Sequence, residues 1–225
     1  MRRRSNWIRI AGSLLLMVAL NQQALAGSPA EPDAAIRAAT ENLLQIVDGA
    51  RGYFDRDPER YYAEVDSAIA PVVDFYSFSR GVMGRWGSKA YYESLGAPEK
   101  KRYQDQVGRF VRVFRQGLVR TYSKGLMAFS GETIEVHSAK PEEIATGVAT
   151  VVQVIHGRDG NQYVIRYKMR KDPDQNWRVR NVTLDTLNLG KVYQSQFASA
   201  AGKFGGDIDA VIENWSVVPE TGRKQ

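Results

Sequence analysis

The spacing of apolar residues divides this chain into a helical first half and a strand-rich second half. Up to Gly125, apolar side chains recur every three or four residues in several separate stretches, which is the period of an amphipathic helix. Proline or aspartate stands at the start of each stretch, as is usual for the cap or first turn of a helix. The pattern predicts helices over residues 32–54, 58–70, 75–83 and 98–125.

Beyond residue 132 the period of the apolar positions changes from 3.6 to 2, which indicates strands. Segments 157–161 and 172–176 are rich in glycine, aspartate and asparagine and are typical of hairpin connections. Two helical stripes follow near the C-terminus. The pattern predicts strands over residues 133–137, 147–156, 162–170 and 177–184, and helices over 189–204 and 208–215.

Helices, then hairpin-linked strands, then helices indicate an α+β protein. We expect an antiparallel sheet of about four strands packed against the N-terminal and C-terminal helices. The strand at 162–170 alternates cleanly, and its odd-numbered residues from Tyr163 to Met169 are large and apolar. The strand at 147–156 is apolar in both phases, which predicts cover on both of its faces. Sheet and helices could meet in a solid core or enclose an apolar cavity.

The first 26 residues have the pattern of a secretory signal peptide. Arginines at positions 2, 3, 4 and 9 precede an apolar run from Ile10 to Leu20, and Ala24-Leu25-Ala26 provides a small-x-small cleavage site. A short membrane anchor is the alternative, but the apolar run falls well short of the roughly 20 residues that span a bilayer. We expect cleavage after Ala26 and export to the periplasm of a Gram-negative bacterium.

Composition excludes several classes of function. Residues 1–26 hold four arginines and no acidic residue, so the remaining 199 residues carry 27 basic and 25 acidic side chains. This balance argues against nucleic-acid binding, which needs a concentrated basic surface. The absence of cysteine excludes thiol catalysis and cysteine-ligated zinc. His137 and His156, the two histidines, lie at predicted strand ends, and we expect no catalytic residue, metal or cofactor.

Three arginines lie on the polar face of the long helix at 98–125. Arg109, Arg112 and Arg120 could form an ordinary solvated surface. They could instead form a docking patch for an acidic partner or for anionic lipid headgroups. The sequence leaves both interpretations open.

Three stretches of the chain stand out together: residues 71–86, the helix after Ala97-Pro98-Glu99 with its aromatic and aliphatic stripe, and residues 167–197 with Trp177-Arg178-Val179 and Leu187-Asn188-Leu189. In combination they resemble the MlaC family, also called toluene-tolerance auxiliary proteins, which carry phospholipids across the periplasm. Their order and spacing extend over nearly the whole chain after residue 26. The resemblance implies a single lipid-binding domain over 27–225, mainly helical at 27–125, with the sheet at 132–184 and closing helices at 187–215.

The resemblance also implies a phospholipid carrier without a cofactor, a monomer that exchanges its cargo with two membrane complexes. One is an inner-membrane ABC transporter with MCE domains and the other an outer-membrane lipoprotein–porin complex. Such a carrier needs a dry, deformable interior, to which methionine and large aliphatic side chains are suited. From the predicted apolar faces we expect the lipid-binding lining to consist of Val82, Met83, Phe110, Phe114, Leu118, Val152, Val154, Ile165, Tyr167 and Met169.

Two other classes of protein fit the same pattern of elements. An enzyme resembling nuclear transport factor 2 would need an acid or base with a shifted pKa inside the apolar pocket. A pocketless periplasmic interaction protein would have a solid interior. An inward carboxylate beside a histidine would favour the enzyme, and a continuous apolar cavity would favour the carrier.

Overall fold

The computed structural model describes residues 31–127, 133–157 and 160–217. The elements are α1 (Pro32–Ala50), α2 (Pro58–Ile69), α3 (Phe75–Val82), the 3₁₀ helix η1 (Gly84–Gly87), α4 (Lys89–Ser94), α5 (Ala97–Leu126), β1 (Thr133–His137), α6 (Pro141–Ala145), β2 (Val148–His156), β3 (Gln162–Lys171), β4 (Trp177–Leu184), β5 (Leu187–Asn188), α7 (Leu189–Lys203) and α8 (Ile208–Glu213). The signal peptide and cleavage site predicted at 1–26 lie outside the described residues.

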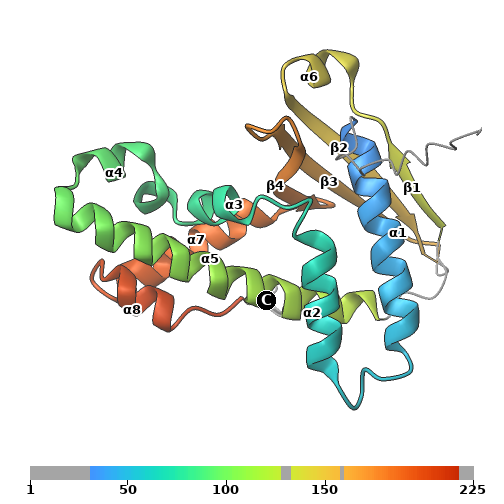
Figure 1. The fold of residues 1–225 in the computed structure, drawn as a ribbon, viewed down its shortest axis with the longest axis horizontal. Helices are drawn as coiled ribbons and strands as arrows, with labels where there is room; N and C mark the ends of the chain where they lie inside the picture. The colour runs from blue at the N-terminus through green and yellow to red at the C-terminus, as the bar shows by residue number, and fades with distance from the viewer. Residues whose placement is uncertain (1–30, 128–132, 158–159, 218–225) are drawn as a thin grey trace, which may run out of the picture.

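The molecule is elongated, with the sheet at one end and a group of helices at the other (Figure 1). α5 runs along the molecule from the helical end and passes behind α2. At 30 residues, and with a rise of about 1.5 Å per residue, this helix is about 45 Å long. It therefore contacts different partners along its length, with α8 and α3 in its first half and α2 in its second.

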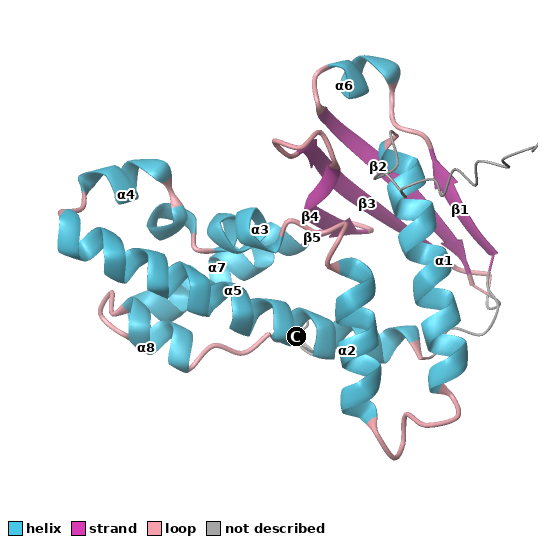
Figure 2. Ribbon diagram, viewed as in Figure 1, coloured by secondary structure: helices cyan, strands magenta, loops and turns pink. Residues whose placement is uncertain are grey.

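The predicted α+β class is confirmed, with one strand more than expected (Figure 2). The sheet is antiparallel throughout, in the order β1-β2-β3-β4-β5. The two-residue strand β5 pairs with the end of β4. Val73 pairs in parallel with Val179 along the same edge of β4, nearer its start. This pairing ties the segment between α2 and α3 to the sheet.

Local sequence signals mark the starts of several helices, among them the predicted α1, α2, α3 and α5. Asp57, Asp74 and Ser88 each accept a hydrogen bond from the backbone amide three residues ahead, at the starts of α2, α3 and α4. Proline occupies the first turn of α1, α2, α5 and α6. The short elements η1, α4, α6 and β5 were not predicted, because none is long enough to show a period of apolar residues.

The buried side chains form three clusters. One lies between α1 and the sheet and includes Ile36, Val151 and Met169. A second fills the helical end and is dominated by aromatic rings, and a third joins α1, α2 and α5 around Tyr61. None of the helices in the described part of the chain is long and apolar enough to cross a membrane.

Only one face of β2 is fully covered, which corrects the expectation of cover on both. Ala149, Val151 and Gln153 are buried on the inner face, toward α1. The intervening residues, including Val152 and Val154, are only partly buried. The outer face is therefore a half-exposed apolar surface and not a second core.

Candidate functional site

An apolar cavity lies between the sheet and the helices. Its volume is about 290 Å³, near the lower end of the roughly 300–1,000 Å³ that is usual for ligand pockets. The wall consists of aliphatic and aromatic side chains with a single serine, from helices and strands far apart in the sequence. It is lined by Leu43, Val65, Ile69, Val73, Phe75, Phe78, Leu118, Val119, Tyr122, Ser123, Leu126, Ile165, Tyr167, Val182, Leu184 and Leu189.

The sheet contributes one patch of wall from two neighbouring strands. Tyr167 on β3 pairs with Val182 on β4, and Ile165 pairs with Leu184. Residues directly opposite in an antiparallel pair project from the same face, so these four side chains form a continuous apolar surface. α1 covers the neighbouring part of the inner face, over β1 and β2, and the cavity lies beside it.

The helices contribute the opposite wall. Leu118, Tyr122 and Leu126 recur at four-residue intervals along the second half of α5 and line the cavity, because residues four apart share one face of a helix. α2 adds Val65 and Ile69. Two ion pairs fasten α2 to α5, since Arg115 binds Asp66 at 2.5 and 2.7 Å and Arg120 binds Glu59 at 2.7 and 2.5 Å.

The polar atoms of the wall are satisfied by internal hydrogen bonds. The Tyr167 hydroxyl donates to Oε1 of Gln153 at 2.7 Å, and Gln153 Nε2 donates to Thr40 Oγ1 at 2.9 Å. Burial raises the pKa of the Tyr167 phenol above its ordinary value, because the charged form would be poorly solvated. The hydroxyls of Tyr122 and Tyr193 lie 2.8 Å apart and share a hydrogen bond.

The cavity contains no group suited to acid or base chemistry near neutral pH. Among the described residues that line it, none is aspartate, glutamate, lysine, arginine or histidine. Both histidines lie beside Glu135, with distances from Nε2 to a carboxylate oxygen of 3.7 Å for His137 and 3.2 Å for His156. Glu135 is paired with Val154, so this group is on the outer face of the sheet. The site can enclose an apolar group by contact alone.

Three of the residues predicted to line the cavity do so, namely Leu118, Ile165 and Tyr167. Five others are buried elsewhere, which corrects the expectation that they face the cavity. Val82, Met83, Phe110 and Phe114 belong to the core of the helical end, and Met169 lies between the sheet and α1.

For Phe110 and Phe114 the reason is the length of α5. Its apolar stripe does not face the sheet throughout, because the part that carries these two rings packs against α3, α7 and α8. Phe110 contacts the ring of Phe197 at a centroid distance of 4.9 Å and that of Trp215 at 5.1 Å. These aromatic contacts fill the helical end, so only the second half of the stripe remains for the cavity.

Val152 and Val154 were expected on the same face as Tyr167, and this prediction is wrong. The hairpin after β2 pairs His156 with Gln162, which sets Val152 opposite Arg166 and Val154 opposite Val164. The true neighbours of Tyr167 and Ile165 are Val151 and Gln153. Because side chains alternate between faces along a strand, Val152 and Val154 point away from the cavity.

Most of the wall was missed by sequence reasoning, although some signals were present. Val65 and Ile69 form one face of a predicted helix, and Val182 and Leu184 alternate on a predicted strand. Their period marked them as inward-facing. Nothing in the sequence pattern indicated that α2 lies across the cavity from β3, since that arrangement depends on long-range packing.

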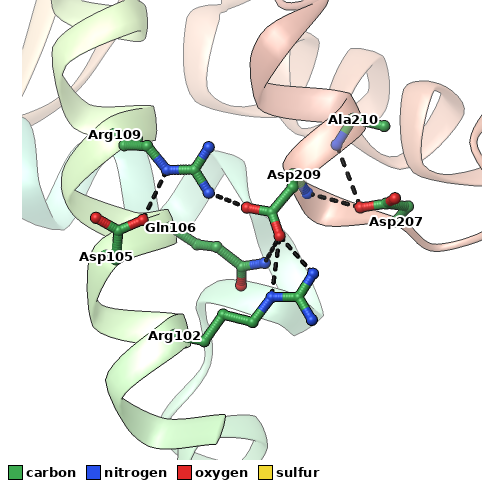
Figure 3. Close-up of polar contacts among 7 residues, drawn as sticks. All are labelled: Arg102, Asp105, Gln106, Arg109, Asp207, Asp209 and Ala210. Carbon is green, nitrogen blue, oxygen red and sulfur yellow. Dashed lines mark hydrogen bonds and ion pairs between the residues drawn. The ribbon is translucent and has the colours of Figure 1, made fainter.

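The three arginines of the possible docking patch differ in their partners. Arg109 binds Asp105 at 2.8 Å and also binds Asp209, which lies at the start of α8 (Figure 3). Arg120 binds Glu59. Arg112 is exposed and forms no ion pair within residues 31–127, 133–157 and 160–217. Two of the three charges are therefore already neutralised within the molecule.

A helix-covered antiparallel sheet with an uncharged cavity defines a class of α+β proteins built around an apolar interior. The profile of the family described as MlaC protein matches residues 37–217, and the chain belongs to this family, as its sequence pattern predicted. The chain is also similar to the toluene tolerance protein ttg2D of Pseudomonas putida, with 26% identity over 205 residues, 91% of this chain and 88% of the relative.

Proposed function

We propose that this protein is a periplasmic carrier of phospholipids, which holds acyl chains in the apolar cavity and leaves the headgroup outside. The observation that carries the proposal is a cavity of about 290 Å³ with no charged side chain among its described lining residues. Membership of the MlaC family supports the same function. A signal peptide over residues 1–26 would deliver the chain to the periplasm, where we expect it to act as a monomer.

The energetics explain why a carrier needs such an interior. Burying one methylene group is worth about 0.8 kcal/mol, so two acyl chains of roughly 15 methylenes each would lose at least ~20 kcal/mol of favourable burial in water. An apolar wall recovers this energy without requiring a particular chain length or degree of unsaturation. A buried charge in the wall would oppose binding.

The cavity must enlarge to accept a whole phospholipid. At about 290 Å³ the cavity is at the lower end of the range for pockets that hold small ligands, whereas two acyl chains contain about thirty carbon atoms. α2 and α5 are held together by the buried cluster around Tyr61 and by the ion pair of Arg115 with Asp66. Across the cavity, α5 and β3 face each other through apolar side chains. Opening would therefore move α2 and α5 together away from the sheet, with the segment at Val73, which pairs with β4, as the hinge.

The partners expected of such a carrier are an outer-membrane lipoprotein–porin complex and an inner-membrane MCE-domain ABC transporter. Exchange between them would maintain the lipid asymmetry of the outer membrane. The carrier itself needs no cofactor and no chemical step. The alternative enzyme would need an ionisable group in the pocket, and the described lining offers only tyrosine and serine hydroxyls that are already hydrogen-bonded.

Native mass spectrometry tests the proposal directly. The protein is purified from the periplasm of its own host without detergent, and the mass of the folded species is compared with that of the bare chain. Solvent extraction then identifies the bound molecule. We expect one or more phospholipids with mixed acyl chains. A bare folded chain in repeated preparations would contradict the proposal.

A matched pair of variants locates the bound lipid. Val182→Trp fills the cavity from β4, and Val152→Trp adds the same side chain on the outer face of the same sheet. Val182→Trp should lose most of the co-purified lipid while its circular dichroism remains that of a folded protein. Val152→Trp should keep its lipid. Equal lipid content in the two variants would place the ligand elsewhere.

A further inference from the structure

A second pocket, of about 250 Å³, lies next to the apolar cavity and has the opposite character. It is formed by α3, β4 and the start of α7, and its wall contains two cations, three side-chain amides and two glycines. Phe78 lines both pockets. The two spaces therefore meet across a single aromatic side chain.

A β-bulge directs one of the cations into this pocket. Lys168 pairs with Asn181 and Met169 pairs with Val179, so Arg180 is an extra residue on β4. Bulges of this kind redirect side chains and are frequent next to functional sites. Arg180 binds Asp74 through one terminal nitrogen at 3.1 Å. Its Nε atom is buried and has no hydrogen-bond partner among the described residues.

The second cation, Lys191, is exposed in the first turn of α7 and forms no ion pair within the described part of the chain. Asn188 and Asn181 hold the backbone here, because they accept hydrogen bonds from the amides of Lys191 and Gly190, each at 3.0 Å. A Cβ atom at position 190 would lie 2.6 Å from Asn181 Oδ1. Glycine thus allows the helix to approach the bulge and to bring Lys191 into the pocket wall beside Arg180.

The charge of this pocket favours an anion. Its described lining contains no carboxylate, and the nearby Asp74 neutralises only one of the two positive charges. Arginine supplies a planar donor pair that matches phosphate geometry, and lysine supplies a mobile point charge. We propose that this pocket, which we call the Arg180–Lys191 pocket, binds a phosphate group.

The position of the pocket suggests two sources for the phosphate. If the apolar cavity carries phospholipid, as proposed above, then the lipid phosphate would lie in the Arg180–Lys191 pocket while the acyl chains lie beyond Phe78. A free phosphate ion has the same chemistry and would use the same donors. The lipid assignment rests on the proposed function, whereas the anion pocket itself does not.

The decisive variants are Arg180→Gln with Lys191→Gln, and Lys191→Gln alone, which leaves the Arg180–Asp74 pair intact. Lys203→Gln is the matched control, because Lys203 is an exposed lysine at the other end of the same helix. Circular dichroism verifies that each variant is folded. The purified proteins are incubated with vesicles containing equal amounts of phosphatidylethanolamine and diacylglycerol, which lacks the phosphate. The ratio of the two lipids bound to the protein is then measured by mass spectrometry.

Inorganic phosphate serves as the second probe, titrated while the amide resonances of Gly190 and Lys191 are followed by NMR. Charge-assisted hydrogen bonds make a change of about tenfold reasonable. A tenfold fall in the bound ratio of phospholipid to diacylglycerol in the double variant, but not in Lys203→Gln, would identify the lipid phosphate as the ligand. A tenfold loss of phosphate affinity with an unchanged lipid ratio would identify the free ion.

If neither measurement changes, the Arg180–Lys191 pocket is not an anion site and the inference is overturned. If the wild-type protein takes up neither lipid but binds phosphate through Lys191, the proposed carrier function fails while the anion pocket stands. The two ideas therefore fail separately.

Discussion

Tyr167 on β3 and Gln153 on β2 are joined by a hydrogen bond of 2.7 Å at the edge of the apolar cavity. Gln153 in turn donates a hydrogen bond from Nε2 to Oγ1 of Thr40 on α1. Gln153 is buried, with 3% of its surface exposed. The pair therefore fixes the orientation of a large cavity side chain and links the cavity wall to the helix that covers the rest of the sheet.

Replacing Tyr167 by phenylalanine should destabilise the protein although the wall remains apolar. The change leaves Oε1 of Gln153 buried without a donor, which costs about 1–3 kcal/mol. The free energy of unfolding in urea measures the effect. Tyr163→Phe is the control, because Tyr163 is 46% exposed. Its substitution should change the free energy of unfolding by no more than about 0.5 kcal/mol. Equal effects in the two variants would show that the hydrogen bond to Gln153 contributes nothing.

Stability at alkaline pH should depend on Tyr61. Burial raises the pKa of this phenol to about 12, compared with about 10 in an unfolded chain, and its hydroxyl donates to the carbonyl of Ser123 at 2.8 Å. Because the folded pKa is raised, this contribution is complete below about pH 10 and disappears as the pH rises through about 12.

The variant Tyr61→Phe isolates that contribution. Its unfolding free energy, measured in urea at about pH 9 and about pH 11, should fall less over this interval than that of the wild type. Other tyrosines with raised pKa values, such as Tyr53, will keep some pH dependence of the unfolding free energy in both proteins. Identical slopes would contradict the assignment to Tyr61.

Stability at acidic pH should depend on Asp172 in the turn before β4. Burial opposes its ionisation, but hydrogen bonds from Arg178 Nε at 2.9 Å and from the Asn176 amide at 2.8 Å outweigh that effect, so the pKa of the carboxyl is lowered. A lowered folded pKa gives stability that is present above the unfolded pKa of about 3.9 and is lost as the pH falls through the folded value.

Asp172→Asn should therefore be less stable than the wild type at neutral pH and should lose less stability on acidification. Thermal unfolding at about pH 7 and about pH 3 measures both effects. The difference in melting temperature between the two proteins should narrow at the lower pH. A constant difference would mean that Asp172 acts only through the geometry of the turn.

The carboxylate of Asp209 should hold α8 against α5. Arg102 donates to it at 3.0 and 2.5 Å, Gln106 donates at 3.0 Å, and Arg109 binds the other oxygen (Figure 3). Asp209→Ala should lower the free energy of unfolding by about 1–3 kcal/mol and speed hydrogen exchange in α8. Glu59→Ala removes an exposed ion pair with Arg120 and should cost less than about 1 kcal/mol.

If the polar face of α5 is a docking patch for an acidic partner, then docking should depend mainly on Arg112, because Arg109 and Arg120 have partners within the molecule. Arg112→Glu should slow lipid transfer between partner complexes several-fold at low salt, with cargo loading unchanged. Lys101→Glu is the control, an exposed lysine on the same helix about 16 Å away along its axis. Equal transfer rates in both variants would exclude this part of the helix as a contact surface.

Periodicity predicted the elements well, because the helices and strands of this chain carry regular apolar patterns. β1 and β4 have the predicted bounds, and the α+β class follows from the order of elements. The register of β2 with β3 could also have been predicted. A five-residue connection at 157–161 sets residue 156 opposite 162, and this pairing alone excludes Val152 and Val154 from the face of Tyr167.

The composition of the cavity wall could not be predicted in the same way. Phe110 and Leu118 belong to the same apolar stripe of α5, which looks alike at both positions. Whether each residue faces the cavity depends on whether α8 or α2 packs against that part of α5. The bulge at Arg180, by contrast, is visible in the sequence, because the apolar positions of β4 shift there from the odd residues Trp177 and Val179 to the even residues Val182 and Leu184. The packing along α5 arises from contacts between distant segments, which no local pattern encodes.

Most residues of the cavity wall act through apolar contacts, which have no preferred direction, and this affects which substitutions the wall can accept. Exchanges among leucine, isoleucine, valine and phenylalanine that preserve total volume are tolerated by apolar interiors. Several of these side chains can therefore change together, provided that the wall stays apolar and its total volume is kept. The Tyr167–Gln153 bond and the bulge at Arg180 depend on particular atoms and backbone geometry, so these positions allow far fewer substitutions.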